Sequence, residues 1–156
     1  MVKIRLQLVT PERTVLSEEV SSLVCPTTEG QITILPGHVG LISTLVSGEL
    51  IAKNDIKENS SDYNIHVAGG FVQVQPGGKE IIILADSAEH FYEIDIARAE
   101  EAKALAEKTL QEQSLSNEEY ALTAYILQKN LSRINIARKH SHRRKAGIAN
   151  QGVFHE

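Results

Sequence analysis

The chain has 156 residues and a mass of 17.2 kDa, which fits one domain, or a small domain with an appendage, and excludes a large multidomain enzyme. Its content of 42% hydrophobic and 23% charged residues is ordinary for a globular protein, and its single cysteine, Cys25, excludes an intrachain disulfide and cysteine-rich zinc sites. The net charge of −4 is unevenly spread, because residues 1–93 hold 6 basic and 12 acidic residues, whereas residues 94–156 hold 10 and 8.

The first half of the chain is predicted to form strands. From Val2 to Leu8, apolar residues alternate with polar ones, which is the period of a strand with one buried face. Turn residues then recur about every 8–12 positions, as they do in β-sandwiches and barrels. The short runs between these turns are residues 20–24, 31–35, 41–46 and 50–53.

A hairpin is predicted where residues 71–74 and 79–85 flank the turn Gln75-Pro76-Gly77-Gly78, because Pro fixes φ and Gly accepts a positive φ. Residues 81–84 are apolar on both strand faces, so we expect a covering layer on each side. We expect His66, between two apolar neighbours, to point outward. These patterns predict a two-layer antiparallel β-sandwich.

After Glu93 the apolar spacing becomes helical. Asp95 favours a helix start through the helix dipole, and Ser116 and Glu119 have the S-x-x-E spacing of a capping box, which predicts a second helix. The stripe of the first helix is Ala99, Ala102, Ala106 and Leu110. The stripe of the second is Tyr120, Ala124, Leu127, Leu131 and Ile134. The two helices are expected to pair as a hairpin, so the fold class is α+β, with the strands first.

The helical hairpin is expected to be held weakly, because the alanines of its seam bury little apolar surface. It is then able to detach as a unit and to lay its apolar and basic faces on another protein. The alternative is a passive helical cap that stays in place.

The chain has none of the motifs G-x-x-x-x-G-K-[ST], G-x-G-x-x-G, G-x-S-x-G and H-E-x-x-H, which argues against common enzyme classes. His140 and His142 point apart on a helix, so we expect no metal site. We expect Cys25 to be a core residue rather than a nucleophile.

The segment from Leu35 to Gly40 holds more turn residues than a strand connection requires. Turn chemistry alone explains it, or else it is a loop at one end of the sandwich, where His38, with Glu29 and Gln31 before it, offers polar contacts to a partner.

Three segments, taken together and in this order, closely resemble the epsilon subunit of F-type ATP synthases: residues 26–42 (PTTEGQITILPGHVGLI), 68–74 (AGGFVQV) and 94–99 (IDIARA). The resemblance covers about residues 1–138 and implies a ten-stranded sandwich followed by a helical hairpin. The implied parts are a sandwich domain at 1–88, a regulatory helical hairpin at 89–138 and a basic, variable extension at 139–156.

The resemblance implies a rotor subunit without an active site, which helps to couple proton flow to ATP synthesis in the central stalk. Its sandwich would bind the gamma subunit and sit on the ring of c subunits. Its helices would restrain ATP hydrolysis by extending into the alpha/beta catalytic head, toward acidic residues of a beta subunit. The implied ring contacts are Glu29, Gln31 and His38. The implied inhibitory contacts are Arg133, Arg138 and Lys139.

Some bacterial relatives bind ATP on the folded hairpin through an I-D-x-x-R-A motif, which residues 94–99 match in full. The resemblance implies that no cofactor is required, but it does imply regulatory ATP, whose phosphates would be bound by arginine guanidinium groups. The implied contacts are Glu89, Asp95, Arg98, Ala99, Lys129 and Arg133. Lys129 stands where those relatives have Arg, and Lys lacks the bidentate geometry. The alternative is structural, with Asp95 capping the helix and Arg98 paired with a nearby acid.

Two other classes stay open. A stand-alone ligand-binding sandwich with dimerising helices predicts exposed aromatic residues on the sheet. A nucleic-acid binder would use the tail from Arg138 to Lys145, but the acidic first part and the 4% aromatic content without Trp argue against it. No targeting segment precedes the sandwich, so we expect the cytoplasmic face of a bacterial plasma membrane, or the stromal face of a thylakoid, reached only through the complex.

Overall fold

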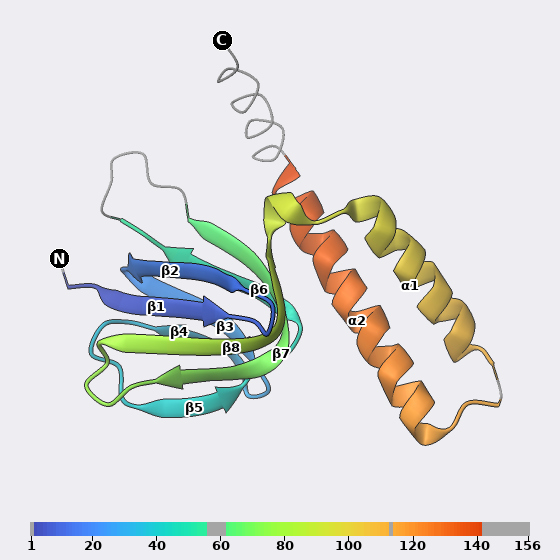
Figure 1. Cartoon of the computed structure of the whole chain (residues 1–156), viewed down its shortest axis with the longest axis horizontal. Helices are drawn as coiled ribbons and strands as arrows, with labels where there is room; N and C mark the ends of the chain where they lie inside the picture. The colour runs from blue at the N-terminus through green and yellow to red at the C-terminus, as the bar shows by residue number, and fades with distance from the viewer. Residues whose placement is uncertain (1, 56–61, 113, 142–156) are drawn as a thin grey trace, which may run out of the picture. The chain divides into compact units, whose positions relative to one another are not determined.

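The structure, a computed structural model, describes residues 2–55, 62–112 and 114–141. Strands precede helices along the chain, which divides into two compact units, Met1–His90 and Phe91–Glu156 (Figure 1). The predicted order, strands and then two helices, is confirmed. Most of the basic extension, from residue 142 onward, lies outside the described residues.

The first unit is one sheet whose strands pair in the order β2-β1-β8-β7-β6-β3-β4, with β5 on β7. Neighbouring strands are antiparallel, except that β1 and β8 run parallel. The strands are β1 (Ile4–Val9), β2 (Thr14–Val20), β3 (Ser22–Thr27), β4 (Gly30–Ile34), β5 (Leu41–Thr44), β6 (Gly48–Lys53), β7 (Tyr63–Val74) and β8 (Glu80–His90).

Strands β7 and β8 take part in both layers of the sandwich. The first half of β7 pairs with β6 and its second half with β5. Gly69 and Gly70 lie between the halves at φ 68° and 103°, in the left-handed region that favours glycine. A Cβ on Gly70 would lie 2.0 Å from the carbonyl oxygen of Leu84. Because both long strands are continuous, the described residues form eight strands rather than about ten.

The predicted hairpin is confirmed, because β7 ends at Val74 and β8 begins at Glu80. Gly78 has φ 64°, and a Cβ there would lie 2.4 Å from the backbone nitrogen of His38. The backbone nitrogen of Gly37 donates to the carbonyl of Gly78 at 3.0 Å. This turn and the loop that follows β4 therefore pack backbone to backbone and form one end of the sandwich.

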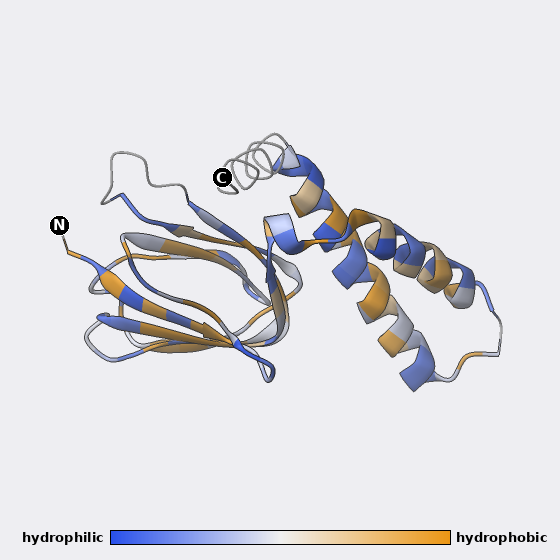
Figure 2. Ribbon diagram, turned by 45° about the horizontal axis from the view of Figure 1, so that its top comes forward, coloured by the Kyte–Doolittle hydropathy of each residue, from blue (hydrophilic) through white to orange (hydrophobic). Residues whose placement is uncertain are grey.

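Alternating side chains build the core between the layers. Figure 2 shows hydrophobic and hydrophilic residues alternating along β1, where Ile4, Leu6 and Leu8 are buried. Cys25 lies in the same core, and burial raises the pKa of its thiol to about 12. The expectation that Cys25 is a core residue is confirmed.

The expectation for His66 is wrong in part. Its neighbours Ile65 and Val67 belong to the core, so the imidazole lies on the opposite face of β7, yet it is only 1% exposed. Period-two alternation fixes the face of a side chain but not whether that face is covered, so it could not predict this burial.

The second unit contains a short 3-10 helix, η1 (Phe91–Glu93), and the helices α1 (Ile96–Leu110) and α2 (Asn117–Lys139). The predicted capping box is confirmed, because Ser116 Oγ accepts from the backbone nitrogen of Glu119 at 3.1 Å and the Glu119 carboxylate accepts from the Ser116 nitrogen at 3.1 Å. Neither of the described helices combines the length and apolarity needed to span a bilayer.

The two helices pack through a seam of small side chains in which Ala99 and Ala106 of α1 are buried with Ile134 of α2. Tyr120 is expected in this seam, but it lies in the first turn of α2 and is 55% exposed. The C-terminal end of α2 buries more apolar side chains than its first turn does. There, a separate cluster buries Phe91, Ile94, Ile136 and Ala137.

Candidate functional site

One outer face of the sandwich exposes a patch of large apolar side chains. Phe71 of β7 pairs across the sheet with Leu84 of β8, and their side chains are 56% and 57% exposed. The next row of the same face holds the exposed Ile42 of β5 and the partly exposed Ile82 of β8, and Val9 of β1 lies beside Leu84. We call these five residues the apolar face.

The apolar face corrects one expectation, that residues 81–84 are covered on both sides. Ile81 and Ile83 are buried in the core, whereas Leu84 points into solvent. A contiguous apolar patch on a soluble protein is typical of a binding surface for another protein. The face therefore identifies the side of the sandwich that is available to a partner.

The polar residues predicted to face one partner are not brought together. Glu29 lies in the turn before β4 and His38 follows that strand, so the five residues Gly30–Ile34 separate them by about 16 Å, at roughly 3.3 Å per residue. Glu29 and Gln31 are exposed, while His38 Nδ1 lies 2.8 Å from the Val39 carbonyl oxygen. The side chains at the two ends of β4 cannot act as one small site.

The I-D-x-x-R-A segment forms the start of α1. Asp95 is the N-cap, and its Oδ1 accepts a hydrogen bond of 3.1 Å from the backbone nitrogen of Arg98. The Arg98 side chain is exposed, and Ala99 is buried in the helix seam. The capping role of Asp95 is confirmed, and the exposed guanidinium of Arg98 is accessible to an anion.

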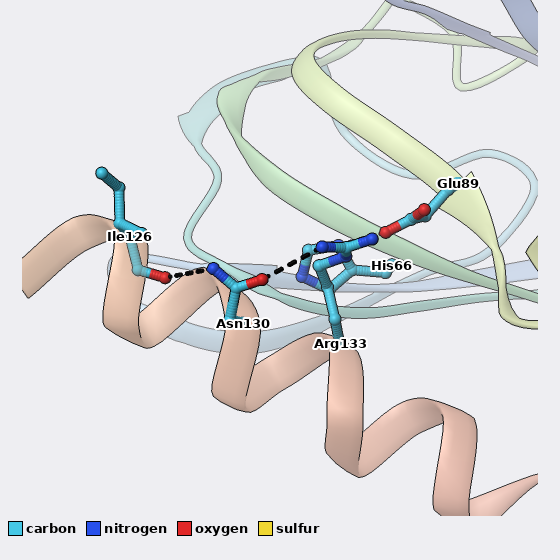
Figure 3. A network of polar contacts seen from close by, with 5 residues as sticks. All are labelled: His66, Glu89, Ile126, Asn130 and Arg133. Carbon is cyan, nitrogen blue, oxygen red and sulfur yellow. Dashed lines mark hydrogen bonds and ion pairs between the residues drawn. The ribbon is translucent and has the colours of Figure 1, made fainter. Parts of the chain in front are cut away.

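The basic residues Lys129 and Arg133 lie one turn apart on α2, so they share one face of the helix. Arg133 Nη1 donates to Asn130 Oδ1 at 3.0 Å, and Asn130 Nδ2 donates to the Ile126 carbonyl at 2.8 Å (Figure 3). The guanidinium of Arg133 is therefore held by a side chain of its own helix.

Glu89, the remaining candidate for ATP, belongs to the sandwich unit. It is the cross-strand partner of His66, and the His66 Nδ1 and Glu89 Oε1 atoms lie 4.0 Å apart (Figure 3). Nearby on the same sheet, Asn64 Nδ2 donates to Glu49 Oε1 at 2.9 Å. Glu89 thus forms part of a polar cluster on β6, β7 and β8.

Arg138 forms an ion pair with Glu100 of α1, and both side chains are largely exposed. The pair links the two helices near the end of α2, where Lys139 is also exposed. No group of three side chains suited to a metal ion occurs among the described residues.

Sequence reasoning missed Glu100 and Asn130 as partners of the basic residues. Glu100 lies 38 residues before Arg138, so no local pattern connects them. Asn130 lies only three residues before Arg133, so a local pattern could have connected them. The pattern is a polar residue at a position where the helical spacing of α2 favours an apolar one.

Comparisons with known proteins give a consistent picture. The family described as "ATP synthase, Delta/Epsilon chain, beta-sandwich domain" matches residues 3–91, and "ATP synthase, Delta/Epsilon chain, long alpha-helix domain" matches residues 93–138. The ATP synthase epsilon chain of Dehalococcoides mccartyi (strain CBDB1) is 50% identical over 107 residues, which are 69% of this chain and 72% of that protein. That of Pelotomaculum thermopropionicum is 43% identical over 103 residues, 66% of this chain and 72% of that protein.

A similar fold occurs in solved structures. A chain in the cryo-EM structure of Euglena gracilis mitochondrial ATP synthase, OSCP/F1/c-ring in rotational state 1, is similar with a TM-score of 0.71 and 22% sequence identity. The similarity covers 85% of this chain and 79% of that one. At this identity the likeness supports the fold alone.

Proposed function

The chain belongs to the ATP synthase delta/epsilon family, and on that premise we propose that it is the epsilon subunit in the central stalk of an F-type ATP synthase, a non-catalytic rotor component. The family membership rests on matches over both units and on bacterial epsilon chains of up to 50% identity. As such, it is a peripheral subunit of a membrane complex. We place it on the cytoplasmic face of a bacterial plasma membrane.

The observation that carries the proposal is the apolar face. Phe71 and Leu84 stand side by side on the sheet, and because each is little more than half exposed, burying the rest of each side chain in an interface is worth about 1–2 kcal/mol. Strands that are already paired present these side chains without reorganisation, so little conformational entropy is lost on docking. We propose that this face binds the gamma subunit.

For the c-subunit ring we propose Glu29, in the turn before β4, together with Gln31 of β4 and His38, which follows β4. The turn is ordered, because Thr27 Oγ1 donates to the Gly30 carbonyl at 2.6 Å and accepts from the Glu29 nitrogen at 3.2 Å. His38 lies at the other end of β4, about 16 Å away at roughly 3.3 Å per residue, and one protein interface of standard size can cover both ends of this strand. We therefore keep His38 in the proposed ring contact.

The helical hairpin is proposed to restrain ATP hydrolysis by opening toward the catalytic head. Its small-residue seam provides little burial, so the two helices separate at modest cost. Opening breaks the Arg138–Glu100 pair and makes Arg138 available, with Arg133 and Lys139, to acidic residues of a beta subunit.

The folded helical unit is proposed to bind regulatory ATP. Arg98 and Arg133 supply guanidinium groups for the phosphates, Lys129 adds a point charge, and Asp95 supplies a carboxylate at the start of α1. Glu89 lies in the other unit, so this proposal rests on the helical residues alone.

Two measurements test the proposed function. Co-expression with a tagged gamma subunit is expected to recover the two chains together, and a chain that does not co-purify would overturn the rotor assignment. In the reconstituted enzyme, removal of residues 94–156 is expected to raise ATP hydrolysis while gamma binding is kept. Unchanged hydrolysis would overturn the inhibitory role and leave the rotor assignment in place.

A further inference from the structure

Asn130 is an unusual residue for its position. It lies in the interior of α2, far from either end, and its side chain is only 4% exposed. Asn is a poor helix former, because its amide competes for backbone hydrogen bonds, and a buried amide without partners is costly. A leucine would fit the apolar spacing of this helix better, so the amide must serve another purpose.

The hydrogen bonds of Asn130 fix the orientation of its amide. The carbonyl of Ile126, four residues earlier, only accepts hydrogen bonds, so it must face the amide nitrogen, at 2.8 Å. The amide oxygen then points the other way and accepts from Arg133 Nη1, three residues later, at 3.0 Å (Figure 3). Both ends of the amide are used, and the direction of the relay follows from the chemistry of its two partners.

We propose that Asn130 is a positioning residue that holds the guanidinium of Arg133 in place to bind the phosphates of ATP. The inference rests on the proposed regulatory ATP and adds a residue to it. Arg has a long side chain that loses much rotamer freedom when a ligand immobilises it. Asn130 restricts the Arg133 side chain before the ligand arrives, so less freedom is lost on binding.

An amide meets both requirements at this position. A leucine removes both hydrogen bonds and leaves the helix intact. An aspartate keeps the acceptor for Arg133 but cannot donate to the Ile126 carbonyl. The two substitutions therefore separate support of Arg133 from the bond within the helix backbone.

The first test needs no nucleotide. Nuclear magnetic resonance of the full chain measures rotation about the Cζ–Nε bond of each arginine, and Arg133→Gln identifies the Arg133 signals. Slow rotation of Arg133 is expected in the wild type and in Asn130→Asp, and measurably faster rotation in Asn130→Leu. Gln128→Leu is the matched control, since Gln128 is an exposed amide on the same helix and should leave the rotation slow. Equal rotation in the wild type and Asn130→Leu would overturn the proposal.

The second test is a double-mutant cycle by calorimetry with ATP. Loss of the positioning bond in Asn130→Leu is expected to weaken ATP binding by about three- to tenfold, the range typical of one hydrogen bond. In the Arg133→Gln background the same substitution should have no further effect. An undiminished effect in that background would show a general structural role and overturn the proposal.

The two tests separate this inference from the proposed function. If the wild-type chain binds no ATP, the proposal of regulatory ATP is overturned, and ATP is no longer the ligand of Arg133. The rotation measurement still decides whether Asn130 positions Arg133. Circular dichroism of each variant confirms that the helices are formed before either test is interpreted.

Discussion

Phe71 and Leu84 are direct cross-strand neighbours on the outer face of the sandwich, and both are more than half exposed. The core residues Val72 and Ile83 also pair with each other, on the opposite face of the same two strands. One pair of strands therefore contributes to the core on one side and to a binding surface on the other. This arrangement explains why the strand from Ile81 to Leu84 is apolar on both faces without being covered on both faces.

Gly70→Ala is expected to destabilise the sandwich severely, by at least about 3 kcal/mol, because the new methyl group would collide with the Leu84 carbonyl at a backbone φ of 103°. Denaturant unfolding measures this loss. Gly30→Ala is the matched control, because Gly30 has φ 104° and open space around it, so only the backbone penalty of about 1 kcal/mol applies. Equal losses of unfolding free energy in the two variants would show that the close approach of strands β7 and β8 does not require glycine at position 70.

Cys25 is expected to resist thiol reagents in the folded protein at pH 8, because burial raises its pKa to about 12 and keeps the thiol protonated. Labelling in the absence and presence of denaturant checks this, and only the unfolded chain should react quickly. The raised pKa also means that the folded state binds the thiol proton more tightly than the unfolded state. Its contribution to stability is complete below the ordinary thiol pKa of 9.0, which applies to the unfolded chain, and declines as the pH rises from there toward about 12.

Asp95 has a capping role in the structure and a proposed role in ATP binding, and two substitutions separate these roles. Asp95→Asn is expected to keep helix stability, since Asn caps as well as Asp does, whereas Asp95→Ala should cost about 1 kcal/mol. If the carboxylate contacts ATP, Asp95→Asn should weaken binding measured by calorimetry while leaving thermal unfolding unchanged. Wild-type affinity in Asp95→Asn would limit this residue to capping.

The Arg138–Glu100 pair gives two variants with opposite expected effects on ATP hydrolysis by the reconstituted enzyme. Glu100→Gln favours the open hairpin by about twofold, the range of an exposed ion pair, and leaves Arg138 available, so hydrolysis should fall. Arg138→Gln also breaks the pair but removes the inhibitory contact, so hydrolysis should rise. Glu107→Gln, which breaks a pair with Lys103 within α1, should leave hydrolysis unchanged. The same direction of change in both variants would contradict the account.

Local patterns predicted the parts of the fold that depend on neighbouring residues. The turn at Gly77 and Gly78 and the capping box of Ser116 and Glu119 were predicted because their chemistry is confined to a few positions. The alternation in β1 likewise predicted a strand with one buried face.

The remaining features depend on residues far apart in the sequence. Alternation cannot show that Leu84 stays exposed while His66 is buried, because it does not show which outer face is covered. The pair of Arg138 and Glu100 forms only when two helices meet. Glu29 and His38 are separated by the length of β4, so their distance can be predicted only once the bounds of this strand are known. The sequence prediction grouped the two residues because they are close along the chain.

The central claim is that the chain is a rotor subunit that docks on gamma through its apolar face. Co-purification of Phe71→Asp with tagged gamma measures it most directly, and Leu105→Asp is the matched control, because Leu105 is 66% exposed on the helical unit. We predict that the wild type and Leu105→Asp are recovered with gamma and that Phe71→Asp is lost, while circular dichroism shows all three folded. Recovery of Phe71→Asp at the wild-type level would contradict the claim.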